Sequence, residues 1–181
     1  ARIWDVKIGN SVATLDDHLG EVNDVAFSPK DKALLATASS DDNMARLWET
    51  TSGKCVAFLE GHTDNVTSVA FSPEDGTFLA TGSWDMTARV WEVEGGACVA
   101  TFEGHLDYVY SVAFGPHHDG ALLATGSSDK TMRLWNVATG VCMTTLEGHS
   151  GQVNSVAFSP GNGALLATGL GNTTARVWLV K

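Results

Sequence analysis

The residues that could carry out catalysis in this chain are a histidine, a hydroxyl residue and an acid that recur together. His18, His62, His105 and His149 are each followed by a Thr within an apolar run and then by an Asp or Asn at a bend. Ser or Thr with His and Asp could supply a nucleophile, its general base and the acid that orients the base. An enzyme needs one such site, whereas this constellation returns about every 43 residues. We therefore interpret it as architecture and expect no enzymatic activity.

Two further motifs could carry chemistry but stand without the companions that such chemistry needs. Ser127 and Lys130 match the S-x-x-K motif of serine β-lactamases, yet the partner motifs of that active site are missing. His117, His118 and Asp119 could offer metal ligands, but they fill a strand-connecting turn in which adjacent histidines point apart. We interpret this turn as solvated and expect neither a metal site nor a cofactor.

Scarce residue types fall in register along the whole chain. All five arginines lie two residues before a tryptophan, and all four prolines close the first strand of a repeat. The tryptophans in register are Trp4, Trp48, Trp91, Trp135 and Trp178. Self-similarity at a fixed period is typical of repeat architectures, so we predict that each repeat forms one structural unit.

Each repeat has the pattern of short β-strands. Apolar and polar residues alternate with a period of two in segments such as 66–71, and Gly, Pro, Asn and Asp turns bound these segments. We predict an all-β chain that forms one domain over residues 1–181. Its sheets are expected over 1–16 (partial), 22–60, 66–103, 109–147 and 153–180 (partial).

Most repeats contain a Gly-His pair about 30 residues before a Trp, and most of these tryptophans precede Asp, Glu or Asn. This pattern resembles the WD-repeat family of β-propellers, and the resemblance extends over the whole chain. It implies a ring of four-stranded antiparallel blades around a channel, with the first strand of each blade innermost. For this chain the resemblance implies three complete blades and two partial ones.

The resemblance also implies a hydrogen-bonded series within each blade, from Trp through Thr and His to an acid. Indole only donates, hydroxyl and imidazole can donate and accept, and carboxylate only accepts, so such a series can be satisfied without water. Carried over by position, the sets are His18, Thr37, Asp42 and Trp48; His62, Thr81, Asp85 and Trp91; His105, Thr125, Asp129 and Trp135; and His149, Thr168, Asn172 and Trp178. In the first set Asp41 competes with Asp42 for the bend. Asn172 replaces the acid in the last set, where we expect a weaker network.

Three aromatic residues, Trp84, Tyr108 and Tyr110, lie outside the repeat register. The resemblance places Trp84 at the end of one blade and the two tyrosines at the start of the next, on the rim around the channel. Aromatic clusters on a polar rim are typical of interaction hot spots, so we predict that they bind a partner. The expected polar surround comprises Asn65, Thr67, Ser128, Gln152 and Asn154. The alternative for Tyr110 is that it merely packs against the next sheet.

The charge balance of the chain favours protein or peptide partners. Its 21 acidic residues exceed its 11 basic ones, giving a net charge of −10, and the arginines belong to the structural register. Phosphate backbones are bound through Lys and Arg side chains, so we expect no nucleic-acid partner. No apolar stretch is long enough to span a membrane. The three cysteines lack zinc or disulfide spacing, which favours a reducing, intracellular and cytoplasmic setting.

The expected strands do not fit one closed ring. They number 17, one more than four blades need, because ARIWDV and ARVWLV occupy the same slot at opposite ends. We expect a segment of a longer propeller. The alternatives are a homodimer that closes an eight-bladed ring by exchanging terminal strands, and a small closed ring or open arc.

These patterns indicate binding rather than catalysis. We expect a scaffold within a multiprotein complex that presents rim residues to protein partners, preferably basic or amphipathic segments. The alternative is a self-assembling structural or engineered repeat module with no dedicated partner. Near-identical repeats would favour that alternative, and the differences at rim positions speak against it.

Overall fold

The computed structural model of the chain describes residues 1–116 and 122–180. This described part contains 17 β-strands in five antiparallel sheets and no helix. The turn with His117, His118 and Asp119 lies outside the described residues. The N-terminal hairpin consists of β1 (Arg2–Trp4) and β2 (Ser11–Thr14).

Three full sheets and one incomplete sheet follow the hairpin, each with its strands in sequence order. The first full sheet contains β3 (Val22–Phe27), β4 (Leu34–Ser39), β5 (Ala45–Glu49) and β6 (Cys55–Leu59). The second contains β7 (Val66–Phe71), β8 (Phe78–Ser83), β9 (Ala88–Glu92) and β10 (Cys98–Phe102). The third contains β11 (Val109–Phe114), β12 (Leu122–Ser127), β13 (Met132–Asn136) and β14 (Cys142–Leu146). The last sheet has three strands, β15 (Val153–Phe158), β16 (Leu165–Leu170) and β17 (Ala175–Leu179).

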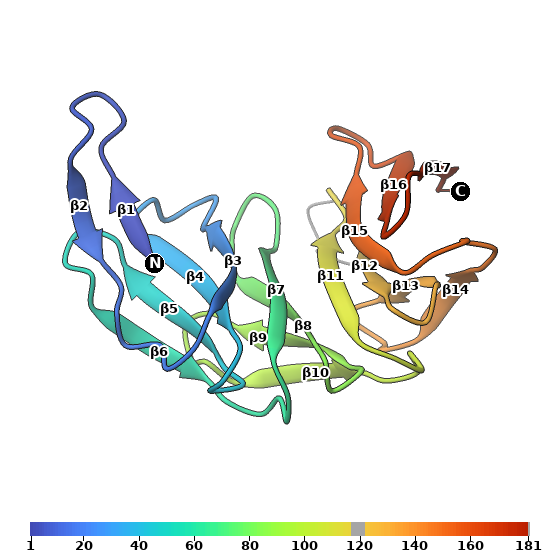
Figure 1. Cartoon of the computed structure of the whole chain (residues 1–181), viewed down its shortest axis with the longest axis horizontal. Helices are drawn as coiled ribbons and strands as arrows, with labels where there is room; N and C mark the ends of the chain where they lie inside the picture. Colours follow the sequence, from blue (N-terminus) through green and yellow to red (C-terminus); the bar gives the residue numbers. More distant parts are fainter. Residues whose placement is uncertain (117–121, 181) are drawn as a thin grey trace.

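The sheets stand side by side along an open arc (Figure 1). Their first strands β3, β7, β11 and β15 are consecutive neighbours in space. The N-terminal hairpin lies at one end of the arc and the last sheet at the other (Figure 1). The all-β propeller architecture predicted from the sequence is therefore confirmed, with three complete blades and two partial ones, and the small closed ring is not what the chain forms.

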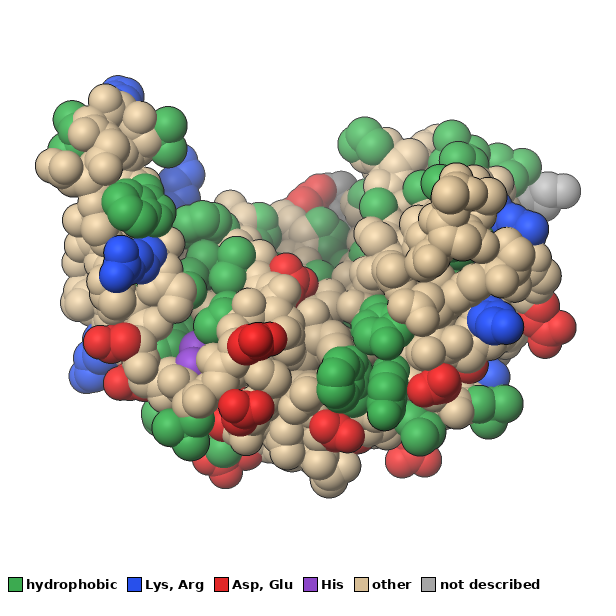
Figure 2. Space-filling view, in the orientation of Figure 1, with side chains coloured by type: hydrophobic (Ala, Val, Ile, Leu, Met, Phe, Trp, Pro, Cys, Tyr) green, Lys and Arg blue, Asp and Glu red, His purple; other side chains and the backbone are tan. Residues whose placement is uncertain are grey.

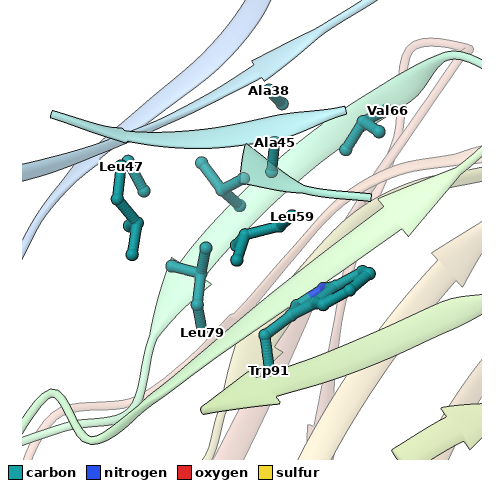
Figure 3. Packing of buried hydrophobic residues seen from close by; sticks show 9 residues of the cluster. Ala38, Ala45, Leu47, Leu59, Val66, Leu79 and Trp91 are labelled. Carbon is teal, nitrogen blue, oxygen red and sulfur yellow. The ribbon is translucent and has the colours of Figure 1, made fainter. Parts of the chain in front are cut away.

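The core lies between consecutive sheets. Ala38, Ala45, Leu47 and Leu59 of the first full sheet meet Val66, Leu79 and Trp91 of the second in one buried cluster (Figure 3). Equivalent clusters join the second sheet to the third and the third to the last. A single sheet would expose this apolar surface to water, so each sheet is stabilised mainly by the next one.

A close approach explains why glycine precedes the histidine in most repeats. Gly61 has φ +150°, and a Cβ there would lie 2.6 Å from Nη1 of Arg89. Gly104 has φ +140°, and a Cβ there would lie 2.9 Å from Nη1 of Arg133. Each guanidinium also lies over the ring of the tryptophan two residues later. The recurring Gly, Arg and Trp are thus three parts of one packing arrangement.

No helix in the described part of the chain is long and apolar enough to cross a membrane.

Candidate partner-binding rim

The second repeat shows the recurring hydrogen-bond set in its complete form. Nε1 of Trp91 donates to Oγ1 of Thr81 over 2.9 Å, and Oγ1 of Thr81 lies 2.6 Å from Nε2 of His62. Nδ1 of His62 lies 2.7 Å from Oδ2 of Asp85. Because the Thr81 hydroxyl accepts from the indole and donates to Nε2, a neutral His62 with its hydrogen on Nδ1 satisfies every member.

The third repeat contains the same set. The distances are 2.9 Å for Trp135–Thr125, 2.6 Å for Thr125–His105 and 2.8 Å for His105–Asp129. Two tightly matched copies on neighbouring sheets indicate a structural device, since each set joins the second and third strands of its sheet, the bend between them and the loop before the sheet. The four side chains therefore fix the loop before the sheet to the second and third strands.

Burial makes a nucleophilic role for these residues unworkable. Thr81 and Thr125 are completely buried, and the side chains of His62 and His105 are 0% and 1% exposed. A nucleophile must reach its substrate, and these hydroxyls face only Trp and His. The geometry supports the structural interpretation of the recurring triad.

In the first repeat the competition between two adjacent acids is resolved in favour of Asp42. Its Oδ2 lies 3.2 Å from Nδ1 of His18 and 2.6 Å from Nη1 of Arg46, whereas Asp41 is exposed. Trp48 and Thr37 complete this set, with 2.8 Å between Nε1 and Oγ1. Nη1 of Arg46 also contacts Nδ1 of His18, so the guanidinium bonds both the acid and the histidine of this set.

The prediction that Asn172 takes the place of the acid in the fourth set is wrong. Nδ1 of His149 lies 3.1 Å from the carbonyl oxygen of Lys130, and Asn172 instead bonds Ser150 and Thr174. An amide carries its own donor, which needs an acceptor, and Ser150 supplies one. Bonds to Thr168 are also longer here, 3.1 Å from His149 and 3.3 Å from the Trp178 indole, so this network is looser.

The hydrogen bonds shift the acidity of the carboxylates in the complete sets. Burial by itself would raise the pKa of Asp85, but the bonds from His62 and Thr87 outweigh it, so this pKa lies well below its ordinary value. The pKa of Asp129 is lowered in the same way, against burial, by His105 and its threonine neighbour. Burial lowers the pKa of His18 and of His149.

These shifts predict that the chain loses stability in acid. An unfolded Asp titrates near pH 3.9, and the folded carboxyls titrate lower, so between these values the unfolded chain binds more protons and acid favours unfolding. The histidines with lowered pKa act in the same direction below about pH 6.5. We expect the unfolding midpoint to fall steadily from pH 7 to pH 3 and to fall less steeply in Asp85→Asn. Thermal unfolding at several pH values tests this, and parallel pH profiles for the two proteins would contradict it.

The structure brings together the three aromatic residues outside the repeat register. Trp84 and Tyr108 stack with ring centroids 4.9 Å apart and an interplanar angle of 18°, and Tyr110 meets Tyr108 edge-on at 6.4 Å. Trp84 follows β8, Tyr108 precedes β11 and Tyr110 lies within β11, so two sheets contribute. All three are half-buried. Tyr110 therefore packs against its neighbours and still reaches the surface.

A pocket of about 260 Å³ opens beside this cluster, between the three full sheets. Its lining residues are Glu21, Asn23, Ser40, Asn65, Thr67, Trp84 and Tyr110. Four of these are predicted rim residues, and Glu21, Asn23 and Ser40 are additions. The sequence could have identified these three residues by their positions in the repeat. They occupy in the first full sheet the rim positions that Trp84, Tyr108 and Tyr110 occupy in the second and third.

Other predicted rim residues lie outside this pocket. Gln152 and Asn154 are exposed at the last sheet, where Nε2 of Gln152 donates to Oδ1 of Asn154 over 3.0 Å. Ser128 is tied to the cluster by its backbone, because its N–H donates to the carbonyl of Tyr108 over 2.8 Å. Within the pocket, Thr67 donates to the carbonyl of Val109 over 2.6 Å. The polar surround thus divides into a group that lines the pocket and a group beyond the aromatic stack.

The polar groups at and beside the pocket are a carboxylate and an indole N–H. Glu21 is the charged residue in its lining and is exposed. Nε1 of Trp84 is buried without a hydrogen-bond partner in the described part of the chain. A buried donor without a partner carries a desolvation cost. The pocket can therefore take an apolar or aromatic side chain with a cation near Glu21.

Comparison with known families matches the sequence model of the WD domain, G-beta repeat, at residues 9–49, 53–92, 96–136 and 140–178. A search of curated proteins gave no match. Repeats of this family generally serve as protein–protein interaction scaffolds and are typically non-catalytic. With its four matches extending over most of the sequence, the chain belongs to the WD-domain, G-beta repeat family.

Proposed function

We propose that the chain is a non-catalytic scaffold that holds a partner peptide in the pocket beside the Trp84 and Tyr108 stack. The observation that carries this proposal is the pocket itself, lined by Trp84 and Tyr110 at positions where the other repeats have small or polar residues. Stacked aromatics offer a large, pre-ordered apolar surface with few rotors to restrict on binding. A scaffold needs such a surface at one place, which agrees with its absence from the other repeats.

The partner segment combines an apolar or aromatic side chain with a nearby Lys or Arg. The apolar group packs against the rings, and the cation lies toward Glu21. Acidic side chains are spread over the face shown in Figure 2, and the net charge of −10 attracts basic segments during encounter. The same charge disfavours nucleic acid as a ligand.

The test is selection of random linear peptides displayed on phage against the immobilised chain, followed by titration of the selected peptides. We expect the peptides to share a basic residue beside an apolar one. Combined Trp84→Ala and Tyr108→Ala substitution should weaken binding by about 30-fold or more, as expected for removal of a hot spot worth about 2 kcal/mol.

Two variants serve as controls for this test. Trp4→Ala removes an exposed indole of the N-terminal hairpin and should leave affinity unchanged. Glu21→Gln should weaken binding of a selected peptide that carries the basic residue. It should leave unchanged the binding of the same peptide in which Gln replaces the basic residue. Peptides that bind the wild type and the double variant equally well would show that this rim is not the binding surface.

A further inference from the structure

Two exposed apolar side chains flank the stack of Trp84 and Tyr108. Met86 lies two residues after Trp84, in the bend before β9, and is 43% exposed; Leu106 lies two residues before Tyr108 and is 82% exposed. Two residues of chain span at most about 7 Å, so each of these side chains begins close to one member of the stack. We call Trp84, Met86, Leu106 and Tyr108 together the rim patch.

The surroundings of the rim patch are acidic. In Figure 2 apolar side chains gather low in the view, near the end of β10 in Figure 1, and acidic side chains lie on both sides of them. Apolar side chains that gather in one exposed place with a polar rim mark a site of interaction with another molecule. The rim patch is therefore a surface for a partner that is larger than one side chain in the pocket.

The backbone presents both flanking side chains from fixed positions. The N–H of Leu106 donates to Oδ2 of Asp129 over 3.0 Å, which ties the loop before β11 to a bend of its own sheet. Met86 has φ +68°, and Oδ1 of Asp85 closes its bend by accepting from the N–H of Thr87 over 3.0 Å. Little ordering of these two segments is needed when a partner binds, so more of the contact energy is left for affinity.

Other backbone groups of the same two segments are already paired inside the chain. The N–H of Trp84 donates to the carbonyl of Asn65 over 3.0 Å. The N–H of Tyr108 donates to Oδ1 of Asp107 over 2.8 Å, and the carbonyl of Tyr108 accepts from the N–H of Ser128 over 2.8 Å. An extended partner strand gains its affinity from main-chain hydrogen bonds to a free sheet edge. Because these groups are taken, the rim patch favours a partner that satisfies its own backbone.

An α-helix is such a partner, since its backbone hydrogen bonds are internal and one face can be apolar. The carboxylates of Asp64 and Asp107 suit the polar edges of that face. Oδ1 of Asp64 accepts from the N–H of Asn65 over 2.7 Å, and Asp107 bonds the N–H of Tyr108 in the same way. Neither carboxylate forms an ion pair with another residue that the structure describes. Both charges are therefore available to Lys or Arg side chains of a bound helix.

We propose that the partner segment is an amphipathic α-helix that lies over the rim patch. One large apolar side chain of the helix enters the pocket beside Trp84, and the next side chains of its apolar stripe contact Met86 and Leu106. Basic side chains at the edges of the stripe lie toward Asp64 and Asp107. The helix is the partner of the scaffold function proposed above and rests on that function, while its conformation and its contacts outside the pocket are new.

The first experiment determines the conformation of a bound peptide. The probe is the tightest-binding peptide selected from displayed random peptides of about 16 residues, which is long enough for four helical turns. The described part of the chain contains no helix, so a helical signal in far-UV circular dichroism that is gained on mixing comes from the peptide. We expect this gain, and we expect apolar residues at positions i, i+3 or i+4, and i+7 of the selected peptides.

A proline in the middle of the probe peptide, on the side away from the apolar stripe, gives the matched control. It should weaken binding about 100-fold, because proline breaks a helix interior. Binding without a helical signal, together with tolerance of this proline, would overturn the proposal and would show that the partner is extended.

The second experiment tests the contacts outside the pocket with residues that other repeats carry in the same turns. Thr63 occupies the Leu106 position in the second repeat, and Asn43 occupies the Met86 position in the first. Leu106→Thr and Met86→Asn should therefore fold, and each should weaken binding of the probe peptide about 5-fold by removing apolar contact. Leu19→Thr is the control, since Leu19 occupies the same position in the first repeat, is 80% exposed and should not affect the affinity.

The outcomes separate this proposal from the one on which it rests. Wild-type affinity in both Leu106→Thr and Met86→Asn would show that the partner is held by the pocket alone, and the helix over the rim patch would be wrong. An equal loss in Leu19→Thr would show that exposed leucines act without regard to position, which would also overturn it. Full binding by the variant with Trp84→Ala and Tyr108→Ala would instead overturn the proposed function itself.

Discussion

Thr81→Val is expected to lower the free energy of unfolding by about 3 kcal/mol. Valine has nearly the shape of threonine, so the core keeps its packing while the hydroxyl is lost. The indole N–H of Trp91 and Nε2 of His62 then remain buried without a partner. Each unsatisfied buried group costs about 1–3 kcal/mol. Denaturation by urea, followed by tryptophan fluorescence and circular dichroism, measures the change.

The control is the same substitution in the last repeat, Thr168→Val. There the bonds to His149 and Trp178 are longer, 3.1 Å and 3.3 Å, and the Trp178 ring is half-buried, so water can replace the hydroxyl. We expect a cost below about 1.5 kcal/mol. Equal losses in the two variants would show that the hydroxyl contributes through packing and not through its hydrogen bonds.

Phe102→Ala is expected to cost about 4 kcal/mol, the largest effect of any single substitution considered for this chain. The Phe102 ring is fully buried between the second and third sheets, with its centroid 5.5 Å from that of Trp135. Truncation leaves a cavity that the rigid sheets on either side cannot close. Chemical denaturation should show the loss, together with a change in the fluorescence of the buried Trp135 indole, which the truncation uncovers.

Leu146→Ala provides the comparison for Phe102→Ala. Leu146 holds the same slot in the third sheet, but it is half-buried and borders the pocket beside β17. Little well-packed surface is lost there, and we expect a cost of about 1.5 kcal/mol. A loss as large as that of Phe102→Ala would mean that the Leu146 side chain is as closely packed as that of Phe102.

The strands of this chain were predictable because their signals are local. Alternation, the prolines that close the first strands and the turn residues specify each strand within a few neighbours, and all 17 expected strands are present. The meeting of Trp84 with Tyr108 was also accessible, since both depart from a repeat whose register is otherwise strict.

The sequence could not predict which of several possible hydrogen-bond partners a side chain takes in the folded chain. Asp42 prevails over Asp41 because the bend turns it toward His18 and Arg46, which only the folded bend decides. Asn172 turns to Ser150 because an amide must satisfy a donor as well as an acceptor. The slot of Glu21 is readable in the sequence, but its meeting with Trp84 and Tyr110 at one pocket depends on the angle between sheets, which no single repeat encodes.

Among the residues that the structure describes, the extensive contacts between sheets join consecutive sheets, and this determines how the molecule unfolds. Loss of order should begin at the two outermost units, each of which has a neighbour on one side only, and advance inward one unit at a time. The second full sheet, covered on both sides, should persist longest. In evolution, the same arrangement allows one whole repeat to be gained or lost without changes in the others, because the apolar contacts between consecutive sheets are equivalent.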